Sequence, residues 1–145
     1  MRCLTRRAVI TSALVLAVAV LAACGGGDDE PTTPASDNAL AERTVEAGQV
    51  TVKLAPETID GRGAAFDVVF DTHSVELDLD VAANARLTVD GTDWPVVGWD
   101  GAGPGGHHRE GTIRFDSAGT AAGIAQLTIG GLAEPVAASW TLEDG

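Results

Sequence analysis

Residues 64–71 read AAFDVVFD, and their alternation decides the fold class. Every second residue from Ala64 to Phe70 is apolar, whereas Asp67 and Asp71 occupy positions of the opposite parity. Successive side chains of a strand point to opposite faces, so this segment predicts a strand with one buried and one solvent-facing side. Further segments with apolar alternation are 50–54, 75–81, 85–89, 94–99, 112–115, 125–129 and 137–142. Nothing in this part of the chain has the capped period of 3.6 that indicates a helix, so we expect an all-β fold.

The number of strands and their spacing favour a β-sandwich. About seven or eight short strands, separated by turn signals such as Asp90-Gly91 and each with one apolar face, predict two sheets packed face to face. Trp94 and Trp99 are five positions apart, so they cannot share one face of a regular strand. We expect either a bulge between them or one exposed indole. The largest side chains expected in the core are Phe66, Phe70, Phe115 and Trp140.

The N-terminus has the order of an export signal. Arg2, Arg6 and Arg7 precede an apolar run over residues 8–20, which is shorter than the about 20 residues of a spanning helix. The run ends in LAAC, residues 21–24, which resembles the lipobox of bacterial lipoproteins. The resemblance implies cleavage before Cys24, acylation of its thiol with chains such as palmitate, and anchoring at the extracytoplasmic face of the cell membrane. The alternative is an ordinary signal peptide that happens to carry a cysteine here.

The cysteine count agrees with a lipid anchor. Cys3 lies in the segment that would be removed and Cys24 would be acylated, which leaves the mature chain without a thiol. Disulfides, thiolate zinc clusters and cysteine nucleophiles are therefore excluded. A blue-copper site is excluded as well, because it needs a thiolate and usually a thioether, and Met1 is the sole methionine.

Charge and composition divide the chain and exclude one class of partner. Removing the three signal arginines leaves 9 − 3 = 6 basic against 21 acidic residues, a net charge of −15. Such a surface repels phosphate backbones, so we expect no nucleic-acid binding. Residues 24–47 are rich in Gly, Asp, Pro, Ser and Thr, which predicts a flexible linker. The expected organisation is a signal peptide at 1–23, the acylated cysteine with its linker at 24–47, and one sandwich domain at 48–145.

A second resemblance covers most of the sandwich. The motifs DTHSV at 71–75 and GGHHREG at 105–111, with the order of strands around them, are similar to immunoglobulin-like domains of uncharacterised bacterial lipoproteins. The resemblance implies an immunoglobulin-like Greek key and a place in the cell envelope, without an assigned activity. In that topology the second and fifth strands are antiparallel neighbours, so the corner after the 64–71 strand meets the glycine-rich loop. The residues expected to converge there are Asp71, His73, His107, His108 and, with them, Glu110.

This histidine rim has two interpretations. Imidazoles and carboxylates suit a divalent transition metal such as zinc or copper(II), with His73, His107, His108 and Asp71 as the ligands. However, adjacent histidines of an extended chain point to opposite faces, so His107 and His108 share an ion only if the glycines bend the backbone. The alternative is that the histidines are corner residues bonded to backbone carbonyls, and that Gly105, Gly106 and Gly111 serve the turn.

The sequence does not predict an enzyme. Ser74 follows His73, but neighbours along a strand diverge and the chain has no G-x-S-x-G elbow. No base, nucleophile and oxyanion donor can be named together, so no catalytic residue is assigned. An acidic ladder without a calcium-binding loop is formed by Glu76, Asp78 and Asp80. We expect a membrane-anchored binding module that takes either a divalent metal at the histidine rim or a protein partner, or else a structural module of the cell envelope.

Overall fold

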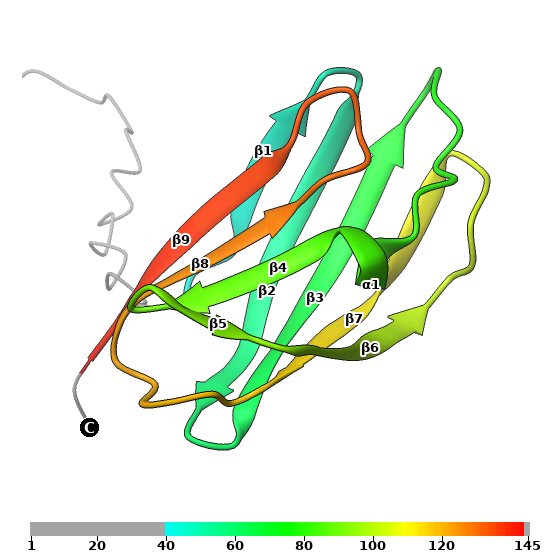
Figure 1. The fold of residues 1–145 in the computed structure, drawn as a ribbon. Coiled ribbons are helices and arrows are strands. Elements are labelled where there is room, and N and C mark those ends of the chain that lie inside the picture. Colours follow the sequence, from blue (N-terminus) through cyan, green and yellow to red (C-terminus); the bar gives the residue numbers. More distant parts are fainter. Residues whose placement is uncertain (1–39, 144–145) are drawn as a thin grey trace, which may run out of the picture. The chain divides into compact units, whose positions relative to one another are not determined.

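A computed structural model describes residues 40–143, which form two antiparallel sheets packed into a β-sandwich (Figure 1). Sheet A contains, in spatial order, β1 (Arg43–Ala47), β2 (Val50–Asp60), β3 (Gly63–Thr72), β7 (His108–Asp116) and β6 (Val96–Gly101). Sheet B contains β5 (Thr92–Trp94), β4 (Ala85–Val89), β8 (Gly123–Ile129) and β9 (Val136–Leu142). The short helix α1 (Val81–Asn84) precedes β4. The predicted signal peptide, Cys24 and most of the predicted linker lie outside the described residues.

The prediction of an all-β sandwich is confirmed, and so is its aromatic core. Phe66 lies at the centre, with its ring 6.1 Å from that of Phe115 and 5.2 Å from that of Trp140. All three side chains, together with Phe70, are at most 2% exposed. Because Trp140 belongs to sheet B and the phenylalanines to sheet A, these contacts join the two layers. No helix in residues 40–143 has the length and apolar composition needed to cross a membrane.

The immunoglobulin-like Greek key is not confirmed. β2 and β3 follow one another in the chain and pair in the same sheet. In the immunoglobulin arrangement, with sheets ABED and CFG, the consecutive strands B and C lie in different sheets. Here the chain instead completes β1–β3 in sheet A, β4–β5 in sheet B, β6–β7 in sheet A and β8–β9 in sheet B.

Two predicted boundaries were wrong. Residues 43–47, expected in the linker, form β1 and pair with β2 around a turn in which Gly48 has φ 69°. Composition alone does not reveal this strand because its apolar residues, Val45 and Ala47, are few. Residues 75–81, expected as a strand, cross from sheet A to sheet B without joining either sheet. Leu77 and Leu79 are buried as the alternation predicted, but the backbone of this crossover pairs with a loop.

The two tryptophans are separated by a change of sheet. Pro95 lies between β5 and β6, where the chain passes from sheet B to sheet A. The register of β6 also shifts between Val96 and Gly98, so the predicted irregularity is present. As a result Trp94 is 2% exposed and Trp99 packs, partly buried, against the same core.

Candidate functional site

Four connections gather at one end of the sandwich, which we call the loop end (Figure 1). They are residues 48–49, 73–80, 102–107 and 130–135. The described chain enters away from this end, because the carbonyl of Ala41 accepts a 2.7 Å hydrogen bond from Trp140 Nε1 late in β9. β1 then runs toward the loop end and β9 runs away from it. Leu40 and Glu143, the first and last described residues, therefore both lie away from the loop end.

The corner after β3 lies beside the start of β7, as the sequence predicted. The two strands pair antiparallel with Asp71 opposite His108. His108 Nδ1 lies 2.6 Å from Asp71 Oδ1, and its Nε2 lies 3.6 Å from Glu110 Oε2. All three side chains are on the solvent side of sheet A and are at least half exposed.

The two carboxylates favour the charged form of this imidazole. The hydrogen bond to Asp71 is the main cause that raises the pKa of His108 above its ordinary value of 6.5, and the charges of Asp71 and Glu110 act in the same direction. Metal ligation needs a neutral imidazole with a free ring nitrogen. Both nitrogens of His108 face carboxylates, so this arrangement favours an ion pair over a metal ligand.

The other two histidines do not join this pair. His73 and His107 are both exposed, and their segments are linked through the backbone, where Thr72 donates 2.9 Å to the carbonyl of His107. Within residues 40–143, no group of three or more His, Cys, Asp or Glu side chains is placed to hold a metal ion. Of the four expected ligands, the structure therefore brings together Asp71 and His108.

The glycines of the histidine motif have different roles. Gly105 and Gly106 have φ of 109° and 78°, as the predicted turn requires. Gly111 instead lies inside β7 opposite Gly101 of β6. The ring of Trp99 occupies the space beside these two glycines, and a Cβ at Gly111 would lie 2.7 Å from its Cζ2 atom. Gly111 therefore makes room for a core indole.

The residue next to the ion pair is buried and was missed by the sequence analysis. Arg109 is 2% exposed and points into the loop end. Its Nη1 donates to the carbonyls of Leu77 at 2.9 Å and Leu79 at 2.8 Å, and its Nη2 donates to Ala102 at 3.0 Å. One guanidinium thus joins the connection 73–80, which contains the crossover, to the glycine-rich connection 102–107. Strand parity would have revealed it, since Arg109 shares the inward parity of Ile113.

Arg109 is buried without a carboxylate in hydrogen-bond contact among the described residues. Burial lowers the pKa of its guanidinium, and the negative charge of Asp80 opposes that shift. Arginine nevertheless stays protonated in proteins. Its charge is therefore met by backbone carbonyl dipoles, and its role is to fix the course of two loops.

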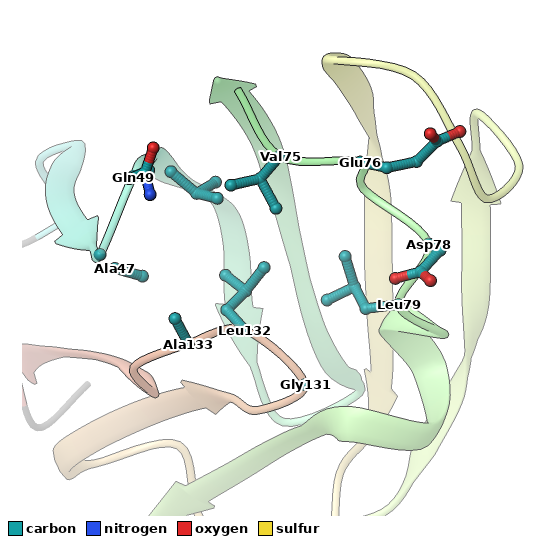
Figure 2. Close-up of a pocket in the computed structure, with 11 residues that line it drawn as sticks. Ala47, Gln49, Val75, Glu76, Asp78, Leu79, Gly131, Leu132 and Ala133 are labelled. Atoms are coloured by element: carbon teal, nitrogen blue, oxygen red, sulfur yellow. The ribbon is translucent and has the colours of Figure 1, made fainter. Parts of the chain in front are cut away.

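A cavity of about 180 Å³ opens at the loop end beside this crossover. In Figure 2 the side chains of Val75, Leu79 and Leu132 point toward one another across it, and the carboxylate of Asp78 lies at its edge. Its walls come from three connections and the adjoining strand ends, namely Ala47, Gly48, Gln49, Val50, Val75, Glu76, Asp78, Leu79, Gly131, Leu132 and Ala133. Sequence reasoning missed this site because no single segment carries it.

Hydrogen bonds fix the walls of the cavity from two sides. Thr72 Oγ1 donates 2.8 Å to the carbonyl of Gln49, and the hydroxyl of Ser74 bonds to the Gln49 amide oxygen. On the other side, Leu77 exchanges backbone hydrogen bonds of 2.9 and 2.8 Å with Gly106 and Gly105. These contacts hold the backbone on either side of Val75 and Leu79.

The four connections of the loop end carry negative charge around this cavity. They contain the acidic residues Glu76, Asp78, Asp80 and Glu134, and neither lysine nor arginine. The nearby Arg109 is buried and its donors are bonded to carbonyls. The loop end therefore presents an apolar hollow in an acidic surrounding, which suits a ligand that is apolar and cationic.

Comparison of the chain with protein-family profiles, with curated proteins and with solved structures gave no significant match.

Proposed function

We propose that this protein is a lipoprotein, anchored through acylated Cys24 at the extracytoplasmic face of the cell membrane, whose sandwich binds a protein partner with its loop end. The observation that carries the proposal is a cavity with mainly apolar walls, placed away from the point where the described chain begins. The signal-like order of residues 1–24 supports the anchor.

A protein partner agrees with the chemistry of the site better than a metal ion does. The ring nitrogens of His108 face Asp71 and Glu110, and residues 40–143 offer no three-ligand group. The cavity has mainly apolar walls with the acidic residues Glu76 and Asp78 beside them, the combination found where a partner's side chain is taken up at an interface. We assign no reaction to it.

The anchor is tested by replacing each cysteine in turn. The parent protein should partition into the detergent phase of a cloud-point extraction, and its mass should include a diacylglycerol group on Cys24. Cys24→Ala should lack the diacylglycerol mass, whereas the matched change Cys3→Ala should carry it as the parent does. A parent protein without this mass, or a Cys24→Ala variant with it, would overturn the anchor.

The binding end is tested by photo-cross-linking in living cells. A photoreactive amino acid at Leu132, on the cavity, should give a discrete protein adduct that Asp78→Lys abolishes. The same amino acid at Thr141, on the outer face of β9, should give none. Adducts of equal yield at both positions, or an adduct at Leu132 that Asp78→Lys leaves unchanged, would contradict the assignment of the loop end.

A further inference from the structure

We infer that the cavity takes up one apolar side chain of leucine, methionine or phenylalanine size from a partner segment in which lysine or arginine stands next to that side chain. The inference rests on the proposed function and names the partner's chemistry at the same site. It follows from the size of the cavity, the nature of its walls and the position of its charges.

The size of the cavity limits what it holds. Its volume is about 180 Å³, and an engineered apolar cavity of about 150 Å³ takes up benzene. The site therefore has room for a single side chain and none for a folded element or a long acyl chain. The side chains of Val75, Leu79 and Leu132 offer dispersion contacts and no hydrogen bonds, and the polar residues Gln49, Glu76 and Asp78 also line the site. An apolar side chain fits, whereas a polar one would lose its hydrogen bonds to water.

The charges beside the cavity select what stands next to that side chain. Asp78 and Glu76 both contribute to its lining, and both are exposed. Figure 2 draws Asp78 and Leu79 at the same side of the cavity, while the carboxylate of Glu76 extends toward the glycine-rich loop. A lysine or arginine adjacent to the inserted side chain reaches one of these carboxylates with its long stem. The buried Arg109 donates to the carbonyls of Leu77, Leu79 and Ala102 and makes no hydrogen bond to Glu76 or Asp78.

A protein segment is favoured over a free organic cation by the small volume of the site. A molecule that fits within about 180 Å³ has few heavy atoms, and small ligands gain at most about 1.5 kcal/mol per heavy atom, usually much less. Useful affinity therefore requires contacts beyond the cavity, such as those that a chain passing over the connections 48–49 and 130–135 would make. Both connections line the cavity, and a Cβ at Gly48 would lie 3.2 Å from that of Ala133, so the two lie side by side (Figure 2).

The test uses the full-length acylated protein in detergent micelles, with its valine and leucine methyl groups labelled for NMR. The probes are three blocked pentapeptides, Gly-Lys-Leu-Lys-Gly, Gly-Lys-Gly-Lys-Gly and Gly-Glu-Leu-Glu-Gly. The first should shift the methyl resonances of Val75, Leu79 and Leu132 saturably, with a dissociation constant on the order of 1 mM, as one inserted side chain and exposed ion pairs allow. The second should cause no such shift, and the third should bind at least about fivefold more weakly.

Two variants test the two halves of the inference separately. Ala133→Leu should fill the cavity from an exposed loop position and abolish the shifts. Asp78→Asn keeps the shape and removes one charge, so it should weaken binding about two- to fivefold. The matched control Asp60→Asn, at the last residue of β2 and away from the loop end, should bind as the parent.

Several outcomes would overturn the inference. Equal binding of the leucine and glycine peptides, or of the lysine and glutamate peptides, would remove the apolar or the cationic requirement. Binding of n-pentylammonium as tight as that of the first peptide would assign the cavity to a free organic cation. If no peptide binds although the Leu132 cross-link is retained, the ligand class is wrong and the proposed function stands. If the cross-link itself is absent, the proposed function fails.

Discussion

Replacing Arg109 with methionine should destabilise the domain by about 2–3 kcal/mol, although the substitution keeps most of the buried volume. Three carbonyls lose the charged donor, but they do not lose equally. The carbonyl of Leu77 retains the N–H of Gly105, and that of Ala102 retains Trp99 Nε1. The carbonyl of Leu79 has no other donor among the described residues.

The magnitude follows from this difference. A buried acceptor left without a donor costs about 1–3 kcal/mol, and each further hydrogen bond lost from a partner that stays satisfied costs about 0.5–1.5 kcal/mol. Part of this loss is offset because the variant no longer buries a guanidinium, whose desolvation is also what lowers the pKa of Arg109. The net loss expected is therefore smaller than the sum of the separate bonds.

Urea unfolding followed by tryptophan fluorescence measures this loss. With m-values of about 1–3 kcal/mol per M for small domains, the midpoint should fall by about 0.7–3 M at unchanged m. Arg114→Met, on the solvent side of the same strand, should stay within about 0.5 kcal/mol of the parent. Amide exchange at Leu77 should accelerate more than at Val68 in the centre of sheet A, because the crossover loosens first. A midpoint for Arg109→Met equal to that of Arg114→Met would refute the reasoning.

Three further predictions concern the histidine motif. Gly111→Ala should lower the free energy of unfolding by about 1–3 kcal/mol, since its Cβ would lie 2.5 Å from the backbone of β6 and 2.7 Å from the Trp99 ring. The control Gly98→Ala should not lower it, because a Cβ at Gly98 meets nothing within 4 Å. Asp71→Asn should lower the pKa of His108 toward 6.5, as NMR titration of the imidazole protons would show. Because the pKa of His108 is raised in the folded state, its pair with Asp71 stabilises the fold fully below pH 6.5 and loses this effect as the pH rises through the native pKa. The difference in melting temperature between the parent and Asp71→Asn should therefore shrink with rising pH. A growing difference would contradict the ion pair. Elemental analysis of tag-free protein should find no stoichiometric zinc or copper. One equivalent of either metal that disappears when the adjacent His107 and His108 are replaced would restore the metal interpretation.

The strands that alternation revealed are those whose apolar side faces the core. Phe66 and Phe70 fixed the centre of sheet A in this way, and Trp140 did so for sheet B. Alternation failed at Leu77 and Leu79, because it reports which side chains are buried and not what the backbone pairs with. That segment buries its leucines as a strand would, yet its hydrogen bonds go to a glycine-rich loop and to an arginine.

The candidate site was predictable only in part. The meeting of Asp71 with His108 follows from antiparallel pairing of two strands that the sequence outlined separately. The cavity did not follow, because Val75, Leu132 and Gln49 come from three connections whose relative positions depend on the complete strand order. Local pattern carries no information about that order.

The alternation of the chain between the two sheets has a consequence for folding. Asp71 and its partner His108 are 37 positions apart, and β3 acquires its second neighbour only when β7 is in place. Non-local pairing of this kind slows folding, because the closure entropy of a long loop is lost before its contacts form. A chain truncated before residue 108 would lack β7, so one edge of β3 would have no hydrogen-bonding partner. Such an unpaired edge, on a strand with one apolar face, is open to aggregation. The domain is therefore expected to fold late, after its last strands have been synthesised.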